Sequence, residues 1–182
     1  MTEDGYVPVD LTRIQQRNVS RESEEAAAFC AQYNRLPQNQ FKARMTLLKT
    51  RLKLQGPALI ESEVFFECGK NMRLGKQVYV NHNVTFLDAA PICIGDHALI
   101  GPNVIISTRH LPLKVNHKAV VEPPAGVTIE NDVWIGANTV ILPGVTIGRN
   151  TIVGAGSVVD TSLPANSIAV GKPCRVIGLN AG

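Results

Sequence analysis

Branched aliphatic residues recur at every sixth position through much of the second half of the chain. The run is unbroken over Ile129, Ile135, Ile141, Ile147, Val153 and Val159. A small or β-branched residue stands two positions before each later member, at Val133, Thr139, Val145, Thr151 and Ser157. A half-buried strand repeats every second residue and a helix every 3.6 residues, so a period of six indicates an internal repeat.

Two shorter series of the same period precede this run, with a shift of two residues between them near Pro91: Leu74, Val80 and Phe86, then Ile94, Ile100 and Ile106. The phrase Gly-Val-Thr-Ile occurs at 126–129 and returns 18 residues later at 144–147. A triangular β-helix has three faces of about six residues each, so 18 residues make one coil. The pattern predicts a mainly β protein, with a parallel β-helix over residues 58–178. Gly or Asn would relieve the backbone at its corners.

Residues 1–57 carry helical signals instead, and the Gly56-Pro57 pair marks the boundary of this module. We expect one helix over residues 22–32 and a second over 40–54. Residues 179–182 form a short C-terminal tail.

The second expected helix contains five basic residues and no acidic residue: Lys42, Arg44, Lys49, Arg51 and Lys53. We interpret them as a solvated helix face. The alternative is a surface that attracts a phosphate-bearing ligand or an acidic partner.

The period of six is lost between Ser107 and Gly126, so residues 108–125 are predicted to form a loop that leaves the β-helix. Loops that interrupt a rigid scaffold often carry function. This loop contains His110 and His117, which are half of the histidines in the chain.

The chain has 182 residues and a net charge of +3, and 45% of its residues are hydrophobic but only 5% aromatic. Aliphatic side chains must therefore fill the core. No long basic stripe and no run of 18 apolar residues occurs, so we expect neither nucleic-acid nor membrane binding. We expect a cytoplasmic protein, because no secretory signal begins the chain.

The four cysteines are Cys30, Cys68, Cys93 and Cys174. They show no CxxC spacing, which predicts reduced thiols and no metal site.

Several phrases of the sequence are similar to those of a known family. They are VYVNHNVTFLD at 78–88, IGD at 94–96, IGPNV at 100–104, VWIG at 133–136, ILPGVTIG at 141–148, VGAGSVV at 153–159 and GKPCRVI at 171–177, preceded by the helical residues 21–34. With these motifs the chain resembles the hexapeptide-repeat acetyltransferases, in particular the maltose, galactoside and nodulation-factor O-acetyltransferase group.

This resemblance implies a left-handed parallel β-helix that forms a homotrimer, with active sites in the clefts between neighbours. It implies acetyl-CoA as the donor, a hydroxyl of a small molecule as the acceptor, and no metal. His110 is implied as the general base, because a neutral imidazole can take the proton of a hydroxyl that attacks the thioester. Asn81 or a backbone N–H would support the developing oxyanion or the acceptor hydroxyl.

The resemblance also assigns residues to the two substrates. On the donor side, an indole ring would pack near the pantetheine arm, small corner residues would let the arm approach the backbone, and basic side chains would face the phosphates. These residues are Trp134, Gly136, Ala155, Gly156, Ser157, Lys172 and Arg175. On the acceptor side we expect Asp10, Phe66, Glu67, Tyr79 and Asp88. Glu67 stands where relatives carry a small polar residue and Ala89 replaces an acid, which favours a less polar acceptor than maltose.

Two other hypotheses stay open. Relatives carry basic residues where this chain has the segment Asp160-Thr161 and Gly178, which favours a CoA-independent isomerase, cyclase or lyase acting on a hydrophobic metabolite. The family's His-Pro phrase reads His110-Leu111-Pro112 here. If His110 is only a loop residue, the chain is a non-catalytic β-helix scaffold.

Overall fold

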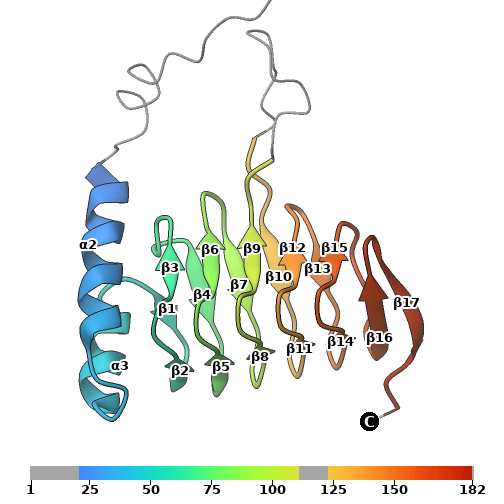
Figure 1. Cartoon of the computed structure of the whole chain (residues 1–182), viewed down its shortest axis with the longest axis horizontal. Coiled ribbons are helices and arrows are strands. Elements are labelled where there is room, and N and C mark those ends of the chain that lie inside the picture. The colour runs from blue at the N-terminus through green and yellow to red at the C-terminus, as the bar shows by residue number, and fades with distance from the viewer. Residues whose placement is uncertain (1–20, 111–122, 182) are drawn as a thin grey trace, which may run out of the picture.

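A computed structural model describes residues 21–110 and 123–181 of the chain. Two helices, α2 (Arg21–Arg35) and α3 (Phe41–Lys49), stand at one end of a stack of β coils (Figure 1). Each coil contributes one short strand to each of three sheets, and every pairing between successive coils is parallel up to β16. This is the parallel β-helix that the period of six predicts.

The strands β1 to β17 fall into three sheets. Sheet 1 contains β1 (Lys53–Leu54), β4 (Met72–Leu74), β7 (Ile92–Ile94), β10 (Val127–Ile129) and β13 (Thr146–Ile147). Sheet 2 contains β2 (Ala58–Ile60), β5 (Val78–Val80), β8 (Leu99–Ile100), β11 (Trp134–Ile135), β14 (Ile152–Val153), β16 (Ser167–Gly171) and β17 (Cys174–Leu179). Sheet 3 contains β3 (Phe65–Phe66), β6 (Thr85–Leu87), β9 (Ile105–Ser107), β12 (Val140–Ile141) and β15 (Val158–Val159).

The residues of the repeat fill the interior, as predicted. Every aliphatic member of the long series is at most 1% exposed, and Thr128 pairs with Thr146 one full coil later. The small residues two positions earlier are also buried. Where they are polar they satisfy the nearby backbone, because a buried hydroxyl without a partner is costly. Thr139 Oγ1, for example, donates to the Gly136 carbonyl at 2.8 Å.

The corners correct one expectation, because Asn and Gly have different roles there. Asn83, Asn103 and Asn138 take φ angles near +57°, which relieves the chain at the turn from sheet 2 to sheet 3. Gly136 does not have a positive φ. It is needed because a Cβ at this position would lie 2.5 Å from the backbone nitrogen of Ala155 in the next coil. Most repeat glycines therefore provide space between coils rather than backbone freedom.

The second helix ends at Lys49, earlier than predicted. Lys53 and Leu54 instead form β1, which pairs with Arg73 and Leu74 of β4. The first helix is longer than predicted, since α2 extends over Arg21–Arg35.

The basic residues of the second segment are not all on a solvated face, which corrects a further expectation. The side chain of Arg44 is buried and donates to the carbonyls of Leu36 and Ile60 at 2.7 and 2.8 Å. Arg51 donates to the Cys68 carbonyl at 2.6 Å. These two cations hold the helices to the first coil, whereas Lys42, Lys49 and Lys53 are exposed.

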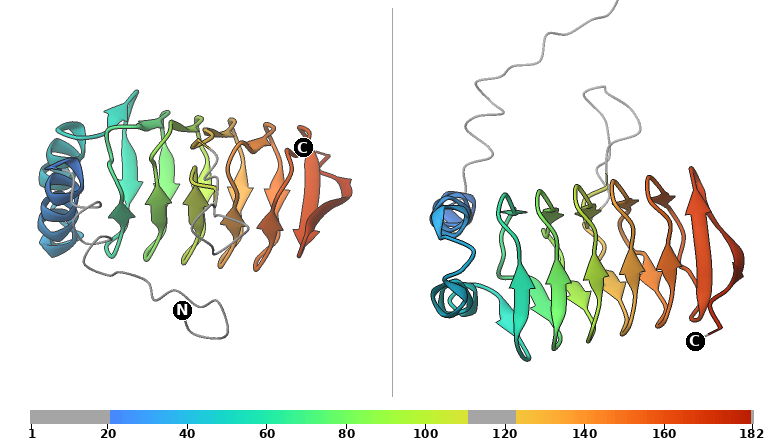
Figure 2. Two further views of the ribbon diagram at one scale, coloured as in Figure 1. Left: turned by 90° about the horizontal axis from the view of Figure 1, so that it is seen from above. Right: turned by 60° about the horizontal axis from the view of Figure 1, so that its bottom comes forward.

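The helices and the β-helix share one hydrophobic core. The ring of Phe29 on α2 lies 6.0 Å from that of Phe66 on β3, and the core continues through every coil to Cys174. At the far end, β16 and β17 form an antiparallel hairpin (Figure 2). Within the described residues, no helix has the length and apolar character needed to cross a membrane.

Candidate active site

The predicted site residues lie on two different edges of the β-helix. Asn81, Gly136, Ala155 and Lys172 each follow a strand of sheet 2, so they stack along the edge where the chain passes to sheet 3 or ends in the hairpin. We call this the 2–3 edge. Glu67, Asp88 and His110 each follow a strand of sheet 3, and they lie on the edge where the chain passes to sheet 1. We call this the 3–1 edge.

The 2–3 edge brings backbone close to the surface. Gly136 N donates to the Val153 carbonyl and Gly156 N to the Ala137 carbonyl, both at 2.8 Å, so adjacent coils are held tightly at this corner. Ala155 is exposed and Gly156 is half-buried with open space beside its Cα. Gly136 is buried, so Ala155 and Gly156 are the small residues that this corner leaves accessible.

The side chain of Ser157 does not face this surface, so only its backbone could contribute to the predicted donor corner. Ser157 is fully buried, and its hydroxyl donates to the Gly154 carbonyl at 2.6 Å. The same oxygen accepts the Gly171 N–H at 3.1 Å. Ser157 thus ties the corner to the terminal hairpin.

Trp134 stands on the outer face of sheet 2 with 53% of its surface exposed. Parallel pairing places it beside Leu99, which in turn lies beside Tyr79. Leu99 is 45% exposed, so the three side chains form a continuous apolar strip across neighbouring coils. Burial and the nearby carboxylate of Glu61 raise the pKa of Tyr79. The strip is suited to bind a flexible, largely apolar chain.

The two predicted phosphate contacts differ in their surroundings. Arg175 Nη1 donates to Asp160 Oδ1 at 2.7 Å, and this contact raises the pKa of Arg175 and lowers the pKa of Asp160. The charge of Arg175 is therefore matched by a carboxylate. Lys172 is exposed at the turn between β16 and β17.

His110 is half-buried on the 3–1 edge, at the point where the chain leaves the coil after β9. Thr108 fixes this point, because its N–H and its hydroxyl both donate to the Leu87 carbonyl, at 3.0 and 2.7 Å. The chain rejoins the stack where Ala125 N donates to the Thr108 carbonyl at 2.9 Å. His117 and Asp10 lie outside the described residues.

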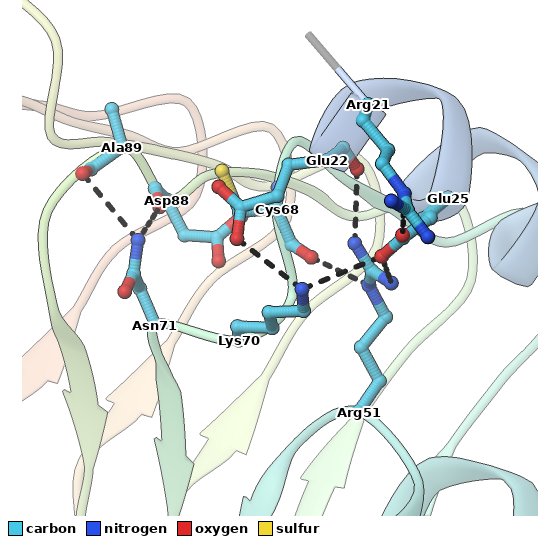
Figure 3. A network of polar contacts seen from close by, with 9 residues as sticks. All are labelled: Arg21, Glu22, Glu25, Arg51, Cys68, Lys70, Asn71, Asp88 and Ala89. Carbon is cyan, nitrogen blue, oxygen red and sulfur yellow. Dashed lines mark hydrogen bonds and ion pairs between the residues drawn. The ribbon is translucent and has the colours of Figure 1, made fainter.

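Asp88 and Phe66 lie beneath this edge, not on its surface, which corrects their assignment as acceptor contacts. Both are 0% exposed. Phe66 stacks on Phe86 with ring centres 5.2 Å apart. Asp88 Oδ1 accepts the Cys68 N–H at 2.8 Å within the polar network drawn in Figure 3. Burial raises the pKa of the Asp88 carboxyl. These two side chains support the wall of the site from within.

A residue that sequence reasoning missed completes this edge. Arg109 Nε donates to Glu67 Oε1 at 2.6 Å, and its Nη2 contacts the same oxygen. The two residues are 42 positions apart, so no local pattern could indicate the pair. The only local signal is that Arg109 immediately precedes His110.

Comparison with known proteins places this arrangement in a family. Residues 126–161 match the family model described as bacterial transferase hexapeptide (six repeats). The chain is 40% identical over 151 residues to the galactoside O-acetyltransferase of Escherichia coli (strain K12), covering 80% of this chain and 73% of the relative. It is 35% identical over 178 residues to the galactoside O-acetyltransferase of Lactococcus lactis subsp. lactis (strain IL1403), covering 96% and 83%. The chain belongs to the galactoside O-acetyltransferase family.

A solved galactoside acetyltransferase in complex with coenzyme A superimposes with a TM-score of 0.83 and 33% identity, covering 96% of this chain and 92% of that one. The coils of this chain are therefore those of the family's left-handed parallel β-helix, and the protein is an acyltransferase.

As a member of this family, the chain has its predicted site residues on separate edges. Sheet 3 lies between the 2–3 edge and the 3–1 edge. Trp134 on sheet 2 and His110 after sheet 3 are therefore not brought together within one chain. Two grooves of the described surface, of about 530 and 640 Å³, lie between α3 and the first coil and on sheet 1. Neither is lined by a predicted site residue.

Proposed function

We propose that this acyltransferase transfers an acetyl group from acetyl-CoA to a hydroxyl of a small-molecule acceptor. The observation that carries the proposal is the match along nearly the whole chain to an acetyltransferase solved with coenzyme A. The galactoside O-acetyltransferases among its relatives favour oxygen as the acetylated atom.

In the proposed reaction, neutral His110 takes the proton of the acceptor hydroxyl while the hydroxyl oxygen attacks the thioester carbonyl. The C–S bond then breaks, the acetyl ester forms, and the imidazolium returns its proton to the departing sulfur. Asn81 suits the oxyanion role, because its Oδ1 accepts the His82 N–H at 2.8 Å. This contact orients the Asn81 amide so that its nitrogen can donate to the developing charge.

The separation of the two edges supports an active site shared between copies of the chain. If the 2–3 edge of one copy faces the 3–1 edge of its neighbour, the small-residue surface and His110 come together. The proposed assembly is a homotrimer with three such clefts. We place it in the cytoplasm, where the four free thiols stay reduced.

The proposed donor site is the apolar strip and the 2–3 edge. Trp134 would pack on the pantetheine arm, and Gly136, Ala155 and Gly156 would allow it to approach the backbone. Lys172 would provide the positive charge that binds a phosphate, because the charge of Arg175 is already paired with Asp160. Tyr79 and Asp10 stay as proposed acceptor contacts, and the acceptor is a small hydroxylated molecule.

The test begins with calorimetric titration of acetyl-CoA into the purified full chain. We expect saturable binding with about one site per chain. Acetyl transfer is then followed with a panel of hexoses, galactosides and lipophilic alcohols, and turnover is expected to vanish in His110→Ala. Absence of acetyl-CoA binding would contradict the proposal and favour CoA-independent chemistry. Full activity of His110→Ala would remove this histidine from the mechanism.

A further inference from the structure

The ion pair between Glu67 and Arg109 spans three coils of the β-helix. Glu67 follows β3 and Arg109 follows β9, while β6 lies between these strands in sheet 3. The backbone N–H of Glu67 donates to the Phe86 carbonyl, and Thr108 donates to the next carbonyl, that of Leu87. The side chains therefore cross the middle coil to meet.

The carboxylate is the better buried of the two groups. The side chain of Glu67 is 20% exposed against 52% for Arg109, and Glu67 Oε2 is buried without a hydrogen-bond partner among the described residues. A carboxylate in this position strongly favours a nearby cation, because a partly desolvated charge without its partner is costly. The guanidinium offers two N–H donors to one oxygen, which restricts its orientation.

The pair acts just beyond β9, at the residue that precedes His110. Backbone contacts hold Thr108, and the Ser107 hydroxyl is 3.1 Å from Arg109 N and 3.2 Å from Arg109 O. Arg109 lies beyond the end of β9, and its side chain makes the long-range contact to Glu67. His110 is the next residue, so the direction of its Cα–Cβ bond depends on how Arg109 is held.

We propose that Glu67 and Arg109 are positioning residues that hold the imidazole of His110 in its catalytic orientation. The inference rests on the proposed function, in which His110 is the general base. It also changes the role of Glu67, which serves the acceptor site through Arg109 and not by direct contact. A general base must lie within hydrogen-bond reach of the proton it removes, so small displacements are costly.

The kinetic test uses the full chain with the acceptor that gives the fastest turnover in the panel. Glu67→Gln and Arg109→Gln are each expected to lower kcat on the order of 10- to 100-fold, because the base is misplaced, with little change in KM for acetyl-CoA. The double variant Glu67→Arg with Arg109→Glu restores the pair in reverse and is expected to recover most of kcat. Arg21→Gln is the matched control, because it breaks the exposed pair with Glu25 on α2. Wild-type kcat in both single variants would overturn the proposal.

A second readout does not depend on turnover. In protein with ¹⁵N-labelled histidine, the ring signals of His110 are assigned by their loss in His110→Ala. We expect them to shift or broaden in Glu67→Gln and to return in the reversed pair, while the signals of His82 and His97 stay unchanged. If the wild type lacks acetyltransferase activity, a shift still supports positioning and the proposed function alone fails. Unchanged His110 signals in Glu67→Gln would contradict the positioning role.

Discussion

The guanidinium carbon of Arg44 lies 4.2 Å from the centre of the Tyr33 ring, and both residues are almost completely buried. The Tyr33 hydroxyl donates to the Ile60 carbonyl at 2.6 Å, and Arg44 donates to the same carbonyl. The two helices are thus joined to the first β coil through one shared backbone acceptor. No carboxylate contact with Arg44 is present among the described residues, so its charge is stabilised by carbonyl groups and the ring.

Arg44→Met is expected to destabilise the protein by about 2–3 kcal/mol, because it removes the donor to the Leu36 carbonyl, one of two donors to the buried Ile60 carbonyl, and the cation over the Tyr33 ring. The measurement is urea-induced unfolding followed by circular dichroism. Lys42→Met is the control, since Lys42 is exposed on the same helix and should change stability by less than about 0.5 kcal/mol. Equal effects of the two substitutions would contradict the structural role of Arg44.

Gly136→Ala is expected to reduce stability by about 1–3 kcal/mol, because the added Cβ would meet the backbone of Ala155 in the next coil. Urea-induced unfolding measures the effect. Gly178→Ala is the matched control, since nothing lies within 4 Å of a Cβ built there. A variant at position 136 as stable as the wild type would show that the coils can separate at this corner without cost.

Asp88 gives an expected pH dependence of stability. Its pKa in the folded protein is raised above the ordinary value of 3.8, chiefly by burial. Folding therefore favours the protonated carboxyl, and stability decreases as the pH rises from about 3.8 towards the folded pKa. Asp88→Asn removes the titration and keeps an oxygen for the Cys68 N–H. Between pH 4 and pH 7, the free energy of unfolding of the wild type should therefore fall relative to that of Asp88→Asn as the pH rises. A difference that is constant over this range would refute the assignment.

Trp134→Ala is expected to weaken acetyl-CoA binding about tenfold, because a large exposed ring loses its contact with the donor. Calorimetric titration gives the Kd directly. Phe41→Ala is the control, since Phe41 is 45% exposed on α3, away from the proposed site. An unchanged Kd in Trp134→Ala would place the donor elsewhere on the β-helix.

Asp160→Asn is expected to tighten acetyl-CoA binding about three- to fivefold at low salt, because it releases Arg175 from an exposed ion pair. The gain should shrink as salt is added. Asp132→Asn removes an acid beside His97, at a corner between sheets 1 and 2, and is not expected to alter the Kd. Weaker binding in Asp160→Asn would mean that the carboxylate orients Arg175 for the phosphate.

The sequence alone predicts the interior of the β-helix well, because each inward position repeats after one face. Ile135 and Val153 follow from counting, since the same physical environment returns in every coil. The end of the second helix is less predictable. Lys53 and Leu54 have a composition compatible with a helix, but pairing with Arg73 and Leu74 of the next coil decides their structure.

The candidate site shows where such reasoning stops. Counting along the coil indicates that Trp134 points outward, and the structure agrees with 53% exposure. Phe66 pairs with Phe86, but their separation is not a multiple of six, so counting does not place Phe66 inside and motif similarity assigned it to the acceptor wall. The Glu67–Arg109 pair depends on the stacking of three coils, so it requires the fold before it can be recognised.

The antiparallel hairpin of β16 and β17 has a consequence for self-association. A stack of parallel coils presents unpaired N–H and C=O groups at each end, and such ends can template growth into fibres. Here α2 and α3 cover the first coil, and β17 reverses the direction of pairing after the last one (Figure 2). Among the described residues, a second chain could therefore not continue the parallel register of sheet 2 beyond β17. The helices at one described end of the stack and the hairpin at the other thus differ from its repeat, which limits end-to-end growth.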